Sequence, residues 1–291
     1  MLKKYSYLFS LFLIFSLSLE AKSLLYRVSS EGGTVYILGS IHLAKAELYP
    51  LDKKIRGAYA KSDVLAVELD PSSHEAMTAI QNTVSSRGTY PAGKSLSTEL
   101  SAKTYEALVS YMSKSGTPVS MVQGMRPWLV MLQLSVTEMQ RLGYSPDLGI
   151  DKHFLDQAKA EMKTVVSLET AQEQMGLISK DDKAFQDKLL FYTLESMHEM
   201  EPMLDDMFRH WQRGDEEAID KIISIPVVTD PDLKDVYDAL IIKRNYKMTQ
   251  KIEGFLRTNK NYFVVIGSGH VVGKEGIVSL LKEKGYRVTQ E

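Results

Sequence analysis

The sequence predicts an α/β fold in which αβ units from the two ends of the chain form one central sheet, with a large helical insertion between them. The first observation behind this prediction is a set of three almost wholly apolar runs: "VYILG" (35–39), "VLAVELD" (64–70) and "YFVVIG" (262–267). Such runs are typical of central strands covered on both faces. The second observation is that residues 97–257 carry apolar side chains spaced three and four apart, which indicates amphipathic helices.

The first 21 residues differ in character from the rest of the chain. Two lysines precede an apolar stretch over residues 5–19, and the small residue Ala21 offers a cleavage point. This order is typical of a secretory signal peptide, so we expect an exported protein, periplasmic or secreted, whose mature chain starts near Lys22. Leu19 is an imperfect residue three positions before the cleavage point, which leaves an uncleaved anchor as an alternative. A buried helix is disfavoured because the run is apolar on every side.

The amino-acid composition indicates a globular protein and excludes several kinds of site. The 291 residues carry a net charge of -2, with 44% apolar and 25% charged residues, which is ordinary for a globular protein with a sizeable core. No basic excess or charged block indicates a nucleic-acid partner. The chain contains no cysteine, which excludes disulfides, thiolate metal sites and a cysteine nucleophile. Export without disulfides fits an envelope protein whose core needs no covalent cross-links.

The remaining elements follow in order along residues 22–291, which we expect to form a single domain. Residues 23–70 are strand-rich with one helix, the middle of about 97–257 is helical with one short strand, and the tail returns to strand, helix and strand. The segments are "SLLYRVSS", "TVYILGS", the helix "DKKIRGAYAKS", "DVLAVELD", the helical middle with the strand "KTVVSLE", "NYFVVIGSGH", the helix "GKEGIVSLLKEKG" and "YRVTQ". No low-complexity linker separates them.

The stretch "YFVVIGSGHVVG" (262–273) has two interpretations. As a phosphate loop, its glycines resemble the dinucleotide fingerprint, but one residue too many separates the last two. Too few residues follow it to complete such a site, and neither a Walker loop nor a G-x-S-x-G elbow occurs in the chain. In the second interpretation, the strand and its turn position a histidine: His270 lies just beyond the carboxyl end of a buried strand, where open α/β sheets bind ligands.

The same four-residue pattern, Gly-Ser-x-His, also follows the strand near the front and ends at His42. Only six histidines occur in the chain, so the repetition favours a shared purpose. Two neutral imidazoles at one sheet edge are suited to a divalent metal ion. We therefore expect His42 and His270 to lie within a few ångströms of each other. The alternative is that both are structural histidines with satisfied hydrogen bonds.

A metal site for hydrolysis also needs a carboxylate, as a ligand or as a general base. Glu68 ends an apolar strand, where a charged side chain is costly to bury unless it is paired or coordinating. Glu169 follows "TVVSL" in the same way and is the second candidate, although its neighbour Thr170 can instead cap the next helix. Asp70 is better explained as a cap.

The helical middle offers a competing metal site. Glu195 and His198 form an E-x-x-H pair, but no second such pair occurs, as a di-iron bundle requires. A solvated helix face explains these residues better. A methionine stripe (Met197, Met200, Met203 and Met207) is expected in the core or lining a groove.

Several segments together resemble a known family. "VYILGSIHL", "VLAVELD", "RPWLVMLQL", "GYSPDLGIDKHFLDQAKAEMKTVVSLETAQEQ", "KRNYKMTQKI" and "FVVIGSGHVVGKEGIVSLLKEKGYRV" are similar in order to the TraB/GumN family, which includes the TIKI-type metalloproteases. The resemblance runs from about residue 24 to the end. It implies a metal-dependent hydrolase, in one branch a protease acting on extracellular protein termini.

The resemblance also implies site residues. The two motif histidines match His42 and His270, and the glutamate matches Glu68. Four further residues fall in matching segments with less defined roles: Arg126, Glu169, Arg244 and Asn245.

The resulting hypothesis is an exported hydrolase of peptides or protein termini that uses a divalent ion such as Mn²⁺, Co²⁺ or Zn²⁺. His42 and His270 hold the ion, and Glu68 completes the shell or accepts the proton of the attacking water. Arg126 or Arg244 then stabilises the oxyanion. The alternative is a non-catalytic envelope module that sequesters a peptide or assists polysaccharide export.

Overall fold

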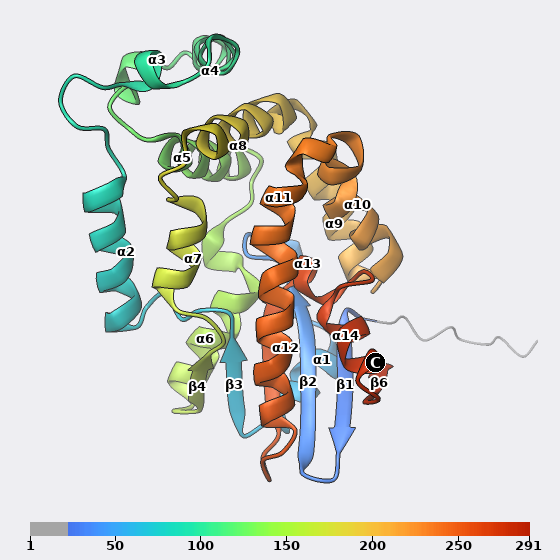
Figure 1. The fold of residues 1–291 in the computed structure, drawn as a ribbon. Coiled ribbons are helices and arrows are strands. Elements are labelled where there is room, and N and C mark those ends of the chain that lie inside the picture. The colour runs from blue at the N-terminus through green and yellow to red at the C-terminus, as the bar shows by residue number, and fades with distance from the viewer. Residues whose placement is uncertain (1–22) are drawn as a thin grey trace, which may run out of the picture.

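A computed structural model of the protein describes residues 23–291, so the expected signal peptide lies outside the described residues. Figure 1 shows a mixed α/β fold around one six-stranded sheet of order β4-β3-β5-β2-β1-β6. The predicted joining of both ends of the chain in one sheet is confirmed. The strands are β1 (Leu25–Ser30), β2 (Gly33–Ser40), β3 (Val64–Val67), β4 (Thr164–Ser167), β5 (Tyr262–Gly267) and β6 (Arg287–Gln290).

The three apolar runs form the centre of the sheet. Strand β5 pairs in parallel with β2 on one side and with β3 on the other. Strand β4 continues the parallel set beyond β3, while β1 pairs antiparallel with both β2 and β6. Every residue of β3 and β5 is buried, as expected of strands covered on both faces.

Aromatic contacts show how helices cover the two faces. Phe263 meets Tyr59 of α1 and Phe154 of α6, with ring centroids 5.6 and 4.8 Å away. Its neighbour Tyr262 stacks on Phe255 of α12 at 4.2 Å. Because successive side chains of a strand point to opposite faces, α1 and α6 cover one face and α12 the other (Figure 1). Helices thus pack on both faces of the sheet at the start of β5, and the parallel strands end together at one edge of the sheet.

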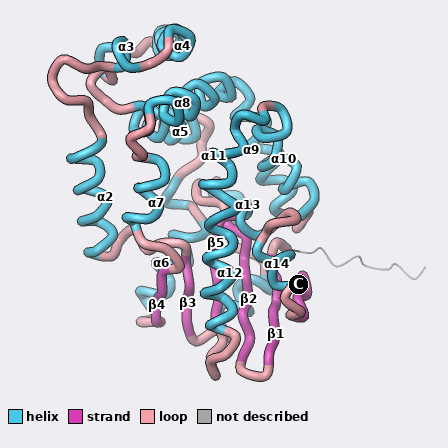
Figure 2. The backbone as a smooth tube through the Cα atoms, viewed as in Figure 1, coloured by secondary structure: helices cyan, strands magenta, loops and turns pink. Residues whose placement is uncertain are grey.

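The other helices lie mainly beyond the carboxyl ends of the parallel strands, as Figure 2 shows for α5, α8 and α9. A second apolar core joins α4, α5 and α8. The helices are α1 (Lys53–Ala60), α2 (His74–Arg87), α3 (Leu96–Glu99), α4 (Ala102–Lys114), α5 (Pro127–Arg141), α6 (Ile150–Ala160), α7 (Ala171–Ile178), α8 (Lys183–Ser196), α9 (Met200–Gln212), α10 (Glu216–Thr229), α11 (Lys234–Tyr237), α12 (Lys243–Phe255), α13 (Ser268–Val271) and α14 (Ile277–Glu283).

The helical region begins earlier than its sequence pattern indicates. Helix α2 starts at His74, whereas the helical middle is expected to begin only at about residue 97. The only fully buried side chains of α2 are those of Ala76 and Ala79, so no stripe of large apolar residues marks it. Within residues 23–291, no helix combines the length and the apolar character needed to cross a membrane.

The methionine stripe is divided between environments. Met197 and Met200 are buried in the second core, and Met207 packs against the main core. Met203 is 42% exposed. The stripe therefore serves mainly to fill the helical region, as the core interpretation predicts.

Candidate functional site

His42 follows β2 and is held in place by the start of α6. The backbone N–H of Ile150 donates to the carbonyl of Ile41 at 3.1 Å. A Cβ at Gly149 would lie 2.2 Å from the carbonyl oxygen of His42, so this close approach requires glycine. Asp151 then accepts from Ser40 Oγ and pairs with His42 Nδ1, each at 2.9 Å. Asp151 contacts the Nδ1 atom of His42 and not its Nε2 atom.

His270 follows β5, in the short helix α13, and is buried. Its Nδ1 lies 2.6 Å from Oδ1 of Asn245 on α12. Asn245 Nδ2 donates to the carbonyl of Glu275 at 2.8 Å, which assigns Oδ1 as the acceptor facing the imidazole. The neutral His270 therefore carries its proton on Nδ1 and presents a lone pair on Nε2.

Two buried glutamates follow neighbouring parallel strands. Glu68 comes directly after β3, and the β3–β4 ladder extends to it because the N–H of Glu169 donates to the Glu68 carbonyl at 2.8 Å. Both side chains are buried, so each needs a compensating partner. Thr170 also caps α7 through a capping box with Glu173, so the two interpretations of this segment hold together.

Arg244 on α12 supplies that partner to both carboxylates. Its Nη2 donates to Glu68 at 2.7 Å and to Glu169 at 2.6 Å, and its Nε donates to Glu169 at 2.9 Å. Nη1 donates to the carbonyl of Leu240, in the π-helical turn that precedes α12. With donors spent on three protein groups, Arg244 acts here as a bridge that positions the two glutamates.

His42, Glu68 and His270 meet around Gly267. The Gly267 N–H donates to Glu68 Oε1 at 2.6 Å. A Cβ at this position would lie 3.2 Å from Glu68 Oε1, 3.2 Å from His42 Nε2 and 3.8 Å from His270 Cδ2. His270 Nε2 lies 3.8 Å from Glu68 Oε1. The structure therefore brings together the three residues that the repeated motif and the apolar strand single out.

The charges around this point separate the pKa values of the two imidazoles. The carboxylate of Asp151 raises the pKa of His42 to about 9. Burial lowers the pKa of His270 to about 4, against the attraction of Glu68. Burial acts to raise the pKa of Glu68, but the histidines, Arg244 and the Gly267 N–H outweigh it and lower that pKa to about 2. At neutral pH, Glu68 is therefore ionised beside the unprotonated Nε2 of His270.

The donor set fits a divalent cation in its chemistry. Metal-binding histidines usually donate their second ring N–H to a carboxylate or carbonyl, as Asp151 and Asn245 allow here. Arg244 contacts two of the nearby carboxylates, Glu68 and Glu169, and the third, Asp151, pairs with His42. As they stand, however, no three His, Asp or Glu side chains of residues 23–291 have the arrangement of a formed metal site.

Arg126 does not belong to this cluster. It precedes α5 and pairs with Asp181 at 2.6 Å, in a separate pocket. Glu195, His198 and Glu199 are exposed on the surface of the helical region.

Sequence reasoning missed Asp151 as a member of the site and left Asn245 without a role. An acid in the first turn of a helix is common, so Asp151 carries no distinguishing signal. Asn245 offers a weak signal, because a fully buried amide must satisfy its hydrogen bonds.

The chain is similar to known proteins over most of its length. The model of the TraB/PrgY/gumN family matches residues 24–290. The uncharacterized protein YbaP of Escherichia coli (strain K12) is 27% identical over 248 residues, which cover 85% of this chain and 87% of YbaP. Metalloprotease TIKI2 of Xenopus tropicalis is 21% identical, covering 87% of this chain and 57% of TIKI2. The metalloprotease TIKI homolog of Nematostella vectensis is 22% identical, covering 87% and 64%. No solved structure is a significant match.

Proposed function

Because this chain belongs to the TraB/PrgY/gumN family, we propose that it is an exported metal-dependent hydrolase that cleaves peptides or protein termini. The observation that carries the proposal is the free Nε2 of His270, fixed by Asn245 and directed at the ionised Glu68. Arg244 and the Gly267 N–H hold Glu68 beside this lone pair, and a divalent cation would take both the imidazole nitrogen and the carboxylate as ligands. The metalloproteases named among the relatives support the choice of peptide bonds as the target.

His42, His270 and Glu68 are the residues that would hold a divalent ion, with Mn²⁺, Co²⁺ and Zn²⁺ as the candidates. His42, whose pKa is about 9, would release a proton when it binds the ion. Such an ion supplies Lewis-acid polarisation of the scissile carbonyl and lowers the pKa of water. Two imidazoles and one carboxylate leave coordination positions open, as a catalytic site requires.

The surrounding residues orient these groups. Asp151 and Asn245 fix the two rings through their Nδ1 atoms, and Arg244 holds Glu68 and Glu169 in place. Gly267 has no side chain to fill the space between Glu68 and His42. Glu68 would either complete the shell of the ion or accept the proton of the attacking water. Since Arg244 is engaged by the two glutamates and Arg126 lies elsewhere, the geometry favours neither arginine as an oxyanion donor.

Removing either imidazole should weaken metal binding and abolish hydrolysis. We expect His42→Ala and His270→Ala to lower the affinity for Mn²⁺, Co²⁺ or Zn²⁺ by at least about tenfold, since losing only a residue that orients a ligand already costs that much. Isothermal titration of the metal-free protein, paired with cleavage of an unstructured peptide pool, measures both effects. His198→Ala is the matched control, because His198 is exposed and distant in the chain from this cluster. Equal affinity in all four proteins would contradict the proposed ligands.

The proposal that the protein is exported depends on residues 1–21, whose composition is that of a signal peptide. We expect envelope or secreted protein to begin near Lys22. N-terminal sequencing of that fraction checks the expectation, and a sequence that still begins at Met1 would show that the segment is retained.

A further inference from the structure

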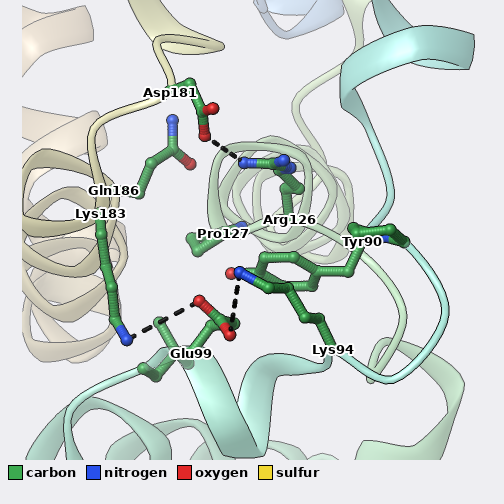
Figure 3. A pocket seen from close by; sticks show the side chains of 10 residues that line it. Tyr90, Lys94, Glu99, Arg126, Pro127, Asp181, Lys183 and Gln186 are labelled. Carbon is green, nitrogen blue, oxygen red and sulfur yellow. Dashed lines mark hydrogen bonds and ion pairs between the residues drawn. The ribbon is translucent and has the colours of Figure 1, made fainter.

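A pocket lies in the helical region, and none of the residues that meet at Gly267 lines it. Figure 3 shows its lining residues. Its volume is about 290 Å³, at the lower end for small-molecule sites. Three segments far apart in the sequence form it: the stretch from Tyr90 to α3, the start of α5, and the loop that leads into α8. Its charged side chains are Lys94, Glu99, Arg126, Asp181 and Lys183.

Arg126 is held in place while most of its hydrogen-bonding capacity remains unused. Its guanidinium lies 5.2 Å from the centroid of the Tyr90 ring, a cation–π contact that fixes its plane. Nη1 donates to Asp181 at 2.6 Å, but the Asp181 side chain is 85% exposed. Nε is buried and has no acceptor among the described residues. A solvent-exposed aspartate is a weak partner, so an incoming carboxylate can replace it.

Two lysines add positive charge without being firmly paired. Lys94 and Lys183 approach the two oxygens of Glu99 at 3.5 and 3.7 Å (Figure 3). Charge-assisted hydrogen bonds are shorter, about 2.7–2.9 Å, so both ammonium groups retain donors for another acceptor. Glu99 is neutralised between them. The pocket therefore has an excess of positive charge and three cationic side chains with spare donors.

We propose that this pocket binds the C-terminal carboxylate of the peptide substrate, with Arg126 as the principal partner and Lys94 and Lys183 beside it. Arginine recognises a carboxylate through two parallel hydrogen bonds, which the flat and preorganised guanidinium favours. The small volume suits one terminal residue better than a long segment. This inference rests on the proposed peptidase function, because it specifies which peptides the protein accepts.

The position of the pocket relates it to the proposed site of cleavage. Helix α7 begins two residues after Glu169 and ends three residues before Asp181. A helix of that length rises on the order of 12 Å. An extended peptide covers this distance with about four residues. A substrate anchored by its last residue would therefore be cut a few residues from its C-terminus.

Binding measured without turnover tests the pocket separately from the hydrolase proposal. The probe is an N-terminally labelled pool of random octapeptides, prepared once as free acids and once as C-terminal amides. Fluorescence anisotropy with wild-type protein in EDTA should show the acids binding at least about tenfold more tightly, on the scale of a lost charge-assisted hydrogen bond. If the protein does not hydrolyse peptides but still prefers the free acids, the result contradicts the proposed hydrolase function and supports the proposed carboxylate pocket.

Four variants sharpen the test. Arg126→Gln should abolish the preference for the free acid. Lys183→Gln should reduce it without affecting the fold, since this lysine is exposed. Asp181→Asn should increase the preference, because the internal competitor for Arg126 is removed, an effect that a purely structural ion pair would not produce. Arg141→Gln, at the far end of α5, removes the same charge and should change nothing.

Equal binding of acids and amides by the wild-type protein would overturn the proposal, as would a preference that survives both Arg126→Gln and Lys183→Gln. Competition distinguishes the source of the anion. N-acetylglycine should displace the acid pool at lower concentration than inorganic phosphate does. The reverse order would show a phosphate site and contradict the assignment to a peptide terminus.

Discussion

Glu68→Gln should lower kcat/KM for peptide hydrolysis by at least ~10²-fold, the usual scale for a general acid–base group. The amide is nearly isosteric and keeps an oxygen that can accept from the Gly267 N–H or from Arg244, so the fold should remain. It cannot accept the proton of the attacking water. Metal affinity should fall less than in His42→Ala or His270→Ala. Metal-supplemented peptide cleavage and titration measure the two effects, with thermal unfolding as the check on folding.

The three substitutions together separate the hypotheses. Full activity in Glu68→Gln, with activity lost in either histidine variant, would remove Glu68 from the mechanism and leave the imidazoles in place. Unchanged hydrolysis in all three variants would contradict the hydrolase proposal. The envelope module that binds a peptide without turnover would then be the better description.

Arg244→Met should destabilise the protein by roughly 3–5 kcal/mol, because it removes the guanidinium that bridges two buried carboxylates and leaves only the imidazoles as counter-charge to Glu68. Arg244 is the only arginine or lysine that contacts both Glu68 and Glu169 within residues 23–291. Urea denaturation in EDTA measures the change. Arg244→Lys, which keeps the charge but cannot form the same fork of hydrogen bonds, should lose less stability. Arg141→Met, which breaks an exposed pair with Glu138, should change the stability far less.

The stability that is lost in Arg244→Met should become smaller as the pH falls. The folded protein lowers the pKa of Glu68 from 4.5 to about 2, so the unfolded chain takes up the proton first as the pH falls. The stability that Glu68 contributes is therefore present above about pH 4.5 and disappears toward pH 2. The difference between wild type and Arg244→Met should shrink across the same window. A difference that stays constant from pH 6 to pH 3 would show that the ion pairs are not its cause.

The centre of the fold was predictable because it depends on local composition. Runs that are apolar at every position, such as the strand ending at Gly267, have few alternatives to a central strand. The same property exposes Glu68 as unusual, since a carboxylate directly after such a run needs a partner. The repeated Gly-Ser-x-His pattern then indicated which two strands have carboxyl ends that lie close together.

The rest depends on contacts between distant segments that leave little trace in the sequence. Helix α2 was missed because alanines, not large apolar residues, form its buried face. Asp151 and Asn245 have their roles only because α6 and α12 dock against the ends of β2 and β5. Arg126 was singled out by resemblance, and its place in a separate pocket could not be predicted because three segments far apart in the sequence form that pocket.

The position of β5 in the sheet has a consequence for how the protein folds during synthesis. Residues 262–267 form the strand between β2 and β3, although they follow those strands by roughly two hundred residues. Until β5 has left the ribosome, the β1–β2 hairpin and the β3–β4 pair have no strand to join them, and each presents an unpaired apolar edge. Such long-range pairing slows folding and favours aggregation of chains in which β5 has not yet paired. Insertion of β5 also brings Gly267 and His270 to Glu68 and His42. The ability to capture an ion should therefore arise in one late step, and truncated or nascent chains that lack β5 should not compete with the finished protein for metal.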